Sequence, residues 1–191
     1  MTDPADNDAP MTATARSAAQ TRVLDAALTL FAEHGVSGTS LQMIADAIGV
    51  TKAAVYRQFQ AKDDIVIAVT ERTLGKLTTA LEAAEEQPNA KRARQVLLAA
   101  VIDVAIADRK AASTLQFDPV VVRLLSEHPP FQQFMTRLYG VLIGDVGVQA
   151  RLGAAMLSGA IGVAVMHPLA ADIDDDTLRT YLLRHTRRFI T

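Results

Sequence analysis

Residues 39–62 read TSLQMIADAIGVTKAAVYRQFQAK and contain two short helical patterns separated by a glycine. In the first pattern, apolar residues recur at the i, i+3, i+4 and i+7 spacing that places side chains on one helix face. These residues are Leu41, Ile44, Ala45 and Ile48. Gly49 follows them, and glycine tolerates the left-handed backbone with which many helices end. The stretch therefore predicts a helix that ends in a tight turn at Gly49.

The second pattern predicts a helix that begins after Thr51. The hydroxyl of Thr51 can cap the helix N-terminus, and Val55 with Phe59 forms an inward face at i, i+4 spacing. The outward positions then hold Lys52, Ala53, Tyr56, Arg57 and Gln58. Such polar and basic side chains contact phosphates and base edges in protein–DNA complexes. The two helices are therefore typical of a helix–turn–helix that enters a DNA groove.

The same stretch resembles the DNA-binding domain of the TetR family of bacterial transcriptional regulators. The family pattern runs from a Thr or Ser pair through I-A-x-x-A/I-G-V to S/T-x-G-x-L/V-Y-x-H-F-x-x-K. This sequence matches it at Thr39, Ser40, Ile44, Ala45, Gly49, Val50, Thr51, Val55, Tyr56, Phe59 and Lys62. Ala53 stands where the family usually has Gly, and Gln58 stands where it usually has His. Both differences lie on the second helix, so they bear on which bases are read and little on the fold.

The resemblance implies a surface that binds double-stranded DNA. Phosphates would be held by Thr39, Ser40, Tyr56 and Lys62. Bases would be approached by Thr51, Lys52, Ala53, Arg57 and Gln42. A homodimer presents two such helices to successive major grooves about 34 Å apart, or a multiple of that distance, so a palindromic operator is expected.

The distribution of charge is compatible with this partner. The whole chain has a net charge of -2, which at first sight argues against nucleic acid, because a DNA-binding domain usually has a basic face. Residues 16–62, however, hold five basic residues against three acidic ones, whereas residues 1–15 hold three acidic residues and no basic one. This modest excess predicts a binder that depends on a few well-placed phosphate contacts.

The length and periodicity of the chain predict an all-α fold. The 191 residues, 50% of them hydrophobic, can form one small domain and one larger domain with its own core. We expect a disordered arm over residues 1–15, a three-helix DNA-binding domain over 16–62, and a larger helical domain over 63–191. Apolar stripes and turn residues predict helices over 18–34, from Lys62 towards Pro88, and near 91–109, 111–117, 119–127, 130–144, 148–166 and 174–190.

The larger domain is assigned by resemblance alone. In the TetR family its helices enclose a pocket for a small-molecule effector, and the last two helices pair with those of a second subunit. This implies that ligand would be bound by Phe117, Phe134, Met135 and Leu138. The dimer interface would include Ala155, Ser158, Gly159 and Gly162, which permit close approach of helices. With few charges nearby, the effector is expected to be largely apolar, and neutral or singly charged; ordinary core packing is the alternative for each aromatic residue.

Residues that could carry catalysis or bind metal do not form a recognisable motif. The chain has no cysteine and four histidines without the spacing that places two ligands on one helix face. The acidic cluster at 172–176 lacks the Gly and the Glu of a calcium loop and is predicted to begin a helix. No phosphate-binding glycine loop or GxSxG elbow is present. We therefore expect no enzymatic activity, no metal and no cofactor.

Residues 152–171 raise the question of a membrane segment, since 20 consecutive positions carry no charge. Gly153, Gly159, Gly162, His167 and Pro168 make the stretch only weakly apolar, so a protein interface is favoured over a bilayer. The N-terminus lacks the pattern of a signal peptide. A cytoplasmic protein is therefore expected.

Two other classes of protein stay open at this stage. A helical small-molecule-binding sensor without DNA binding would account for the aromatic residues of the larger domain, but not for the pattern from Thr51 to Lys62. A hydrolase or lyase has less support, because the larger domain offers few charges that could form a polar catalytic site.

Overall fold

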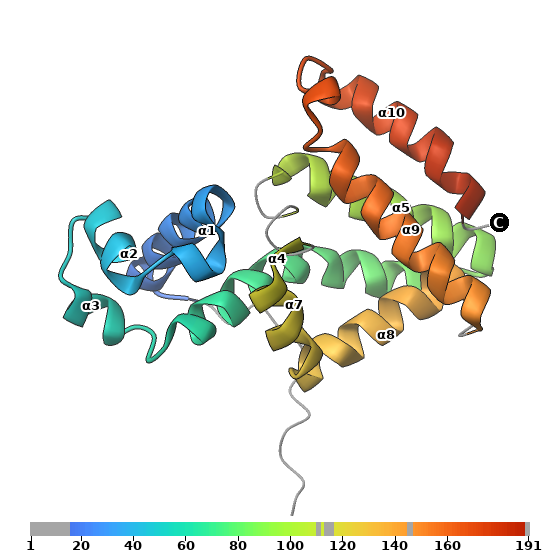
Figure 1. The fold of residues 1–191 in the computed structure, drawn as a ribbon. Helices are drawn as coiled ribbons and strands as arrows, with labels where there is room; N and C mark the ends of the chain where they lie inside the picture. The colour runs from blue at the N-terminus through green and yellow to red at the C-terminus, as the bar shows by residue number, and fades with distance from the viewer. Residues whose placement is uncertain (1–15, 110–111, 113–116, 145–146, 190–191) are drawn as a thin grey trace, which may run out of the picture.

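The computed structural model describes residues 16–109, 112, 117–144 and 147–189, and this part of the chain is helical without strands (Figure 1). The all-α fold is therefore confirmed. The expected arm at 1–15 and most of the expected helix at 111–117 lie outside the described residues. Within 111–117, only Ala112 and Phe117 are described, and both are helical.

Three helices form the N-terminal group: α1 (Ala18–Gly38), α2 (Leu41–Ala47) and α3 (Lys52–Tyr56). Ser17 caps α1 by accepting a hydrogen bond from the Gln20 amide at 3.2 Å. Gly35 interrupts α1 with φ 71° and ψ 163°, which is the break that the sequence predicts after residue 34. Glycine adopts this backbone without the Cβ clash that other residues incur.

The long helix α4 (Lys62–Glu85) joins the N-terminal group to the remaining helices. Asp63 and Asp64 lie in its first turn, where carboxylates stabilise the positive end of the helix dipole. Figure 1 shows α1–α3 packed around the first half of α4, while its second half runs into the larger bundle. The helix is thus shared by two groups of helices.

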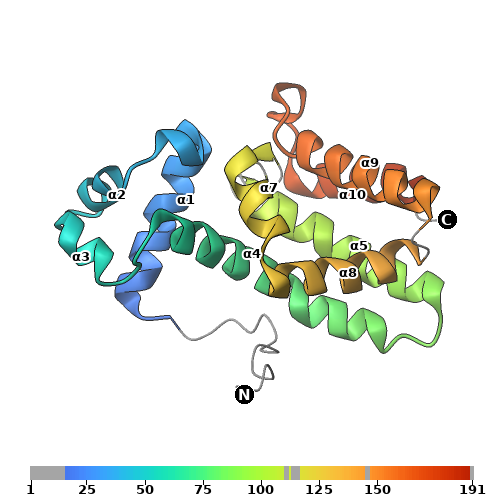
Figure 2. The ribbon, with the colours of Figure 1, turned by 60° about the horizontal axis from the view of Figure 1, so that its bottom comes forward.

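The larger bundle contains α5 (Ala90–Ala107), α7 (Pro119–Ser126), α8 (Pro129–Ile143), α9 (Val148–Ala164) and α10 (Asp175–Thr186). Short 3-10 turns follow α9 at Pro168–Ala170 and α10 at Arg187–Phe189. Figure 2 shows α9 and α10 side by side on the outer side of the bundle. Asp174 caps α10 by accepting from the Thr177 amide at 2.9 Å, which confirms that the acidic cluster begins a helix. This bond holds the pKa of Asp174 below its ordinary value.

Two hydrophobic cores stabilise the molecule. The first unites α1, α2 and α3 with the start of α4, including Ile65 and Val69, and extends to Val121 and Leu125 of α7. The second joins the rest of α4 to α5, α8, α9 and α10. The first core therefore continues beyond residue 62, and α7 packs against the N-terminal helices although it follows them by more than fifty residues. No helix in the described ranges combines the length and hydropathy needed to cross a membrane.

Candidate nucleic-acid interface and adjoining cavity

The turn between α2 and α3 has the geometry predicted from Gly49. Gly49 adopts φ 68°, and its N–H donates to the Asp46 carbonyl at 3.1 Å. The Val50 N–H donates to the Ala45 carbonyl at 3.0 Å, which satisfies a second group at the end of α2. Ser40 caps α2 and Thr51 caps α3, each accepting an amide hydrogen bond at 3.2 Å. The polar groups at these helix ends are thereby paired, and the angle between α2 and α3 is fixed.

Helix α3 presents its predicted DNA-contacting residues to solvent. Val55 and Phe59 are 0% and 8% exposed and anchor the helix in the first core. The residues on the other face are exposed, and they are Thr51, Lys52, Ala53, Tyr56 and Arg57. The Lys52 ammonium lies 5.6 Å from the centre of the Tyr56 ring, a cation–π distance. The structure thus groups a hydroxyl, an ammonium, a phenol and a guanidinium on one free surface.

The predicted contacts from α2 lie beside this surface. Ser40 is exposed, and its oxygen accepts from Met43, so its O–H remains able to donate. Gln42 is also exposed, and its side-chain amide donates to Asp46 at 2.7 Å. Arg22 of α1, by contrast, donates to the Ile48 carbonyl at 2.8 Å, so its side chain ties α1 to the turn after α2.

Thr39 occupies a different place from the one the sequence suggests. Its side chain is only 2% exposed, and its hydroxyl lies within hydrogen-bond distance of the carbonyls of Leu30, at 3.2 Å, and Gly35, at 2.8 Å. A buried hydroxyl with these partners has no path to a phosphate on the surface. The structure therefore places the Thr39 side chain against the C-terminal end of α1, where it bonds the helix carbonyls.

Lys62 also contacts the end of α1. Its ammonium donates to the carbonyls of Val36 at 2.7 Å and Thr39 at 2.9 Å. Both carbonyls follow the break at Gly35, so the cation meets the negative end of a helix, where basic groups are favourable. An ammonium has three donors, and a phosphate contact from Lys62 would have to use the one that remains. Sequence periodicity gave no signal of this role, because Lys62 and Val36 are distant in the chain.

A cavity of about 420 Å³ lies in the larger bundle. Most lining residues are apolar and come from α4, α5, α7, α8 and α9, with Phe117 and Phe131 near the N-terminal group. Among the predicted ligand residues, Phe117, Met135 and Leu138 line the cavity. Phe134 does not: it is 4% exposed and packs in the second core. Its neighbour Met135 lies about 100° around the helix, as 3.6 residues per turn require, and takes the cavity-facing position.

The polar groups of the cavity are few and mostly paired. The hydroxyls of Thr70 and Thr73 donate to carbonyls of their own helix at 2.9 and 3.1 Å. Burial raises the pKa of Tyr139 above its ordinary value, and a hydrogen bond with Ser158 partly opposes that shift. Asp108 lies 3.5 Å from the Lys76 ammonium, so the carboxylate in the lining has a cationic neighbour. This chemistry suits a mainly apolar molecule with a limited polar portion.

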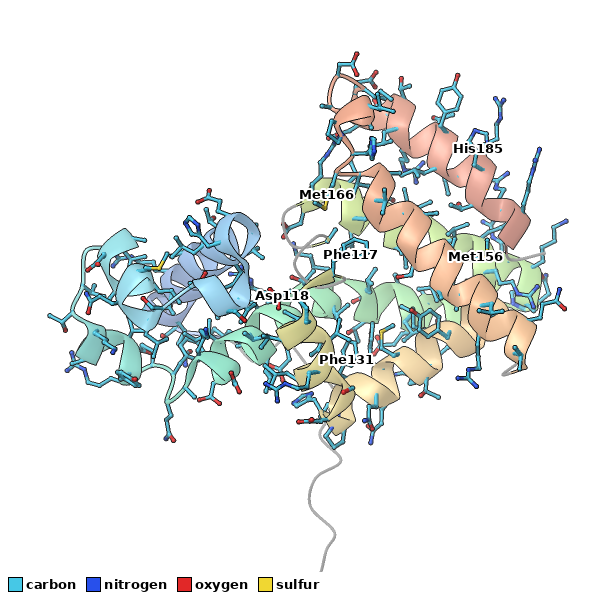
Figure 3. All side chains as sticks on the ribbon, in the orientation of Figure 1. Phe117, Asp118, Phe131, Met156, Met166 and His185 are labelled. Carbon is cyan, nitrogen blue, oxygen red and sulfur yellow. The ribbon has the colours of Figure 1, made fainter. Side chains whose placement is uncertain are left out.

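Helix α9 has two faces of different character. The four predicted interface residues line the cavity, and they are Ala155, Ser158, Gly159 and Gly162. Large apolar side chains project outwards instead: Leu152 is 59% exposed, Met156 58% and Val163 47%. Their i, i+4, i+11 spacing puts them on one face. Figure 3 labels Met156 on α9, Met166 just beyond the end of α9, and His185 on the neighbouring α10. Small residues thus line the cavity, but Ala155 is also exposed, and Gly159, seven positions after Leu152, lies on the same side of the helix as the outward residues.

Within the described ranges, no group of three or more His, Asp or Glu side chains is placed to hold a metal ion. The exposed α3 surface, the cavity and the apolar outer face of α9 each gather groups suited to recognition.

Comparison with known proteins assigns the N-terminal part of the chain to a class. Residues 23–69 match the pattern of the bacterial regulatory proteins of the tetR family, so this segment of the chain is similar to that family. It is 44% identical over 69 residues to the HTH-type transcriptional regulator AcrR of Shigella flexneri, covering 34% of this chain and 32% of that protein. It is 41% identical over 51 residues to the HTH-type transcriptional repressor KstR2 of Rhodococcus jostii (strain RHA1), covering 27% of this chain and 25% of that protein.

The similarity in sequence therefore spans about a third or less of those two relatives, whereas similarity in fold extends much further. The structure of the transcriptional regulator FadR from Bacillus subtilis in complex with stearoyl-CoA superposes with a TM-score of 0.66, covering 90% of this chain and 97% of that chain at 20% identity. At this identity the likeness shows the fold alone. It confirms an N-terminal helix–turn–helix domain followed by a larger helical domain.

Proposed function

We propose that the protein is a ligand-responsive transcriptional repressor that binds a palindromic DNA operator as a homodimer in the cytoplasm. The observation that carries this proposal is the exposed face of α3, where Lys52 begins the helix and Tyr56 and Arg57 lie at its C-terminal end. Two basic groups and a phenol on a helix held from behind by Val55 and Phe59 are suited to a major groove. The match of residues 23–69 to the tetR family of bacterial regulatory proteins supports the same function.

Binding to the DNA upstream of the protein's own gene tests this proposal. Fluorescence anisotropy at two salt concentrations would compare that DNA with a scrambled sequence of equal length. Arg57→Ala should reduce affinity for the upstream DNA by about 5- to 150-fold, the effect of losing a base contact of 1–3 kcal/mol. Lys91→Ala is the matched control, since Lys91 is an exposed basic residue on α5, away from α3. It should change affinity by less than about twofold.

The cavity supports an effector that is largely apolar and neutral or singly charged. Its lining offers the Asp108 carboxylate, which has a cationic neighbour, and the Tyr139–Ser158 hydroxyl pair, against a majority of aliphatic and aromatic side chains. The FadR structure holds stearoyl-CoA, so a fold of this kind accommodates a molecule with a long apolar part. A thermal-shift screen of apolar metabolites is the direct search for the effector. Ligands that bind the folded state raise the unfolding temperature.

The outward face of α9 supports dimerisation. Leu152, Met156 and Val163 are each about half exposed or more, and a row of large apolar side chains on one helix face is typical of a protein interface. Tyr181 of the adjacent α10 is 49% exposed and extends the surface. We infer that α9 and α10 pair with the same helices of a second subunit. The predicted residues Ala155, Ser158, Gly159 and Gly162 would then contribute at the inner edge, where close approach matters.

A small-molecule sensor that does not bind DNA is the alternative. It predicts effector binding together with equal, weak affinity for upstream and scrambled DNA. The exposure of the whole α3 face favours the regulator, because a sensor has no use for a basic surface so far from the cavity.

A further inference from the structure

One carboxylate joins the cavity-bearing bundle to the N-terminal helices. Asp118 caps α7 with Oδ1, which accepts from the amides of Val120 at 2.9 Å and Val121 at 3.4 Å. Its second oxygen, Oδ2, accepts from the N–H of Val36 at 2.7 Å. The same side chain is therefore bonded at once to the start of α7 and to the end of α1. Figure 3 shows Asp118 between the N-terminal helices and α7.

On one side of this bridge lies the cavity. Phe117, the residue before Asp118, lines the cavity and is 51% exposed. Leu125, on the same helix as the cap, lines the cavity and also belongs to the first core. A molecule that fills this end of the cavity packs against both residues. It therefore contacts the two ends of the segment that holds the Asp118 carboxylate in place.

On the other side lies the turn that closes α1. Val36 is fully buried, and both of its peptide groups are engaged: the N–H by Asp118 and the carbonyl by Lys62. Gly35 beside it has φ 71°, and a Cβ there would stand 3.4 Å from Asp118 Oδ2. The ammonium of Lys62 also bonds Thr39, the residue before the cap of α2. A shift of Asp118 is thereby passed to the segment that leads into the helix–turn–helix.

We propose that Asp118 is a positioning residue that transmits the state of the cavity to the DNA-binding helices through its bond to Val36. This inference rests on the proposed function and names the regulation of the same site. A ligand changes DNA affinity only by binding one conformation better than another. The bridge supplies a directional contact that one position of α7 keeps and another breaks. Sliding apolar contacts, such as that of Val121, constrain this movement less.

The Asp118→Asn variant separates the two roles of the side chain. Asn caps helix N-termini about as well as Asp, through its side-chain oxygen, so α7 keeps its cap. In place of Oδ2, Asn has an NH₂ group, which donates hydrogen bonds and cannot accept one from the Val36 N–H. Asp174→Asn is the matched control, because Asp174 caps α10 in the same way and lies far from Val36 in the fold.

Amide hydrogen exchange of the full chain first establishes the bridge. In Asp118→Asn the Val36 amide should exchange at least about tenfold faster, the factor that corresponds to one ordinary net hydrogen bond. The amides of Val120 and Val121 should keep their protection, and Asp174→Asn should leave Val36 unchanged. Equal Val36 exchange in wild type and Asp118→Asn would overturn the inference, whether or not the protein binds DNA.

The coupling between cavity and DNA then tests transmission. The probe is the neutral apolar dye Nile red, titrated with and without saturating upstream DNA. In the wild type, DNA should weaken dye binding by about 5- to 150-fold, the usual range for coupled sites. The coupling ratio is the dye dissociation constant with DNA divided by the constant without DNA. Asp118→Asn should lower this coupling ratio at least about threefold, with the dye affinity in the absence of DNA nearly unchanged. Asp174→Asn should have the wild-type coupling ratio.

A merely structural role for Asp118 would leave the ratio unmoved. An Asp118→Asn protein with fast Val36 exchange and the wild-type ratio therefore overturns the inference while the proposed function stands. A wild-type protein that binds upstream DNA no better than scrambled DNA contradicts the proposed function instead.

Discussion

The ammonium nitrogen of Lys62 lies 2.7 Å from the carbonyl oxygen of Val36, so the first residue of α4 is tied to the end of α1. The contact explains why a basic residue is favourable at a helix N-terminus, where the dipole alone disfavours it. It also links the long helix to the segment before α2. Lys62 thus has a structural role whatever else it contacts.

Lys62→Met should destabilise the protein by about 1–3 kcal/mol, because the carbonyls of Val36 and Thr39 lose a charged donor. The methionine side chain keeps most of the apolar stem, so packing is largely retained. Lys62→Arg keeps a charged donor at this position and should therefore lose less stability than Lys62→Met. Urea denaturation measures both. A Lys62→Met protein that unfolds like the wild type but binds all DNA sequences more weakly would contradict this prediction. It would indicate that the Lys62 ammonium contacts a DNA phosphate instead.

Gly35→Ala should destabilise the protein by about 1–3 kcal/mol, since the backbone at φ 71° and ψ 163° lies in a region that essentially only glycine adopts. Gly140→Ala is the matched control. Gly140 lies inside α8, and a Cβ there meets no atom within 4 Å. That change should stabilise the protein by up to about 1 kcal/mol through helix propensity. Equal unfolding temperatures of the two variants would be inconsistent with a left-handed residue at 35.

Gly159→Leu should fill part of the cavity without unfolding the protein. Gly159 lines the cavity, and an added Cβ meets no atom within 4 Å. The larger side chain should therefore weaken Nile red binding at least about tenfold, as steric exclusion from an apolar pocket does. Gly140→Leu serves as the comparison. Unchanged dye binding in Gly159→Leu, together with dissociation into monomers, would place Gly159 at the subunit interface rather than at the ligand.

Met156→Glu should dissociate the dimer, because it buries a charge in the apolar face of α9. Val122→Glu makes the same kind of change at a residue that is 51% exposed on α7, and it should leave assembly intact. Sedimentation velocity distinguishes the two. A Met156→Glu protein that sediments as a wild-type-like dimer, or a monomeric wild type, argues against the proposed interface.

Local chemistry made several features predictable from sequence. Gly49, Ser40, Thr51 and Asp174 act through neighbours within a few residues, so their turns and caps follow from spacing alone. The outward face of α3 also follows, because burial of Val55 and Phe59 sets the rotation of the helix.

Features that depend on distant contacts were not predictable. Lys62 turns towards the Val36 carbonyl, 26 positions away, and the Asp118 bridge spans 82 positions. The rotation of α8 decides that Met135, and not Phe134, lines the cavity. From Leu152 to Ala164, α9 carries no charged residue on either face, so composition alone did not distinguish the wall of the cavity from the outer surface. These outcomes are set by how helices pack together, which a single sequence does not encode locally.

The most direct measurement is a hydroxyl-radical footprint of the DNA upstream of the gene. A dimeric regulator with one α3 in each half-site should protect two segments centred about 34 Å apart, or a multiple of that distance, within a palindrome. Arg57→Ala should lose the protection at concentrations where Lys91→Ala keeps it. Uniform cleavage along the whole region, at a protein concentration that saturates Nile red binding, would contradict the proposed function and leave a small-molecule sensor without DNA binding.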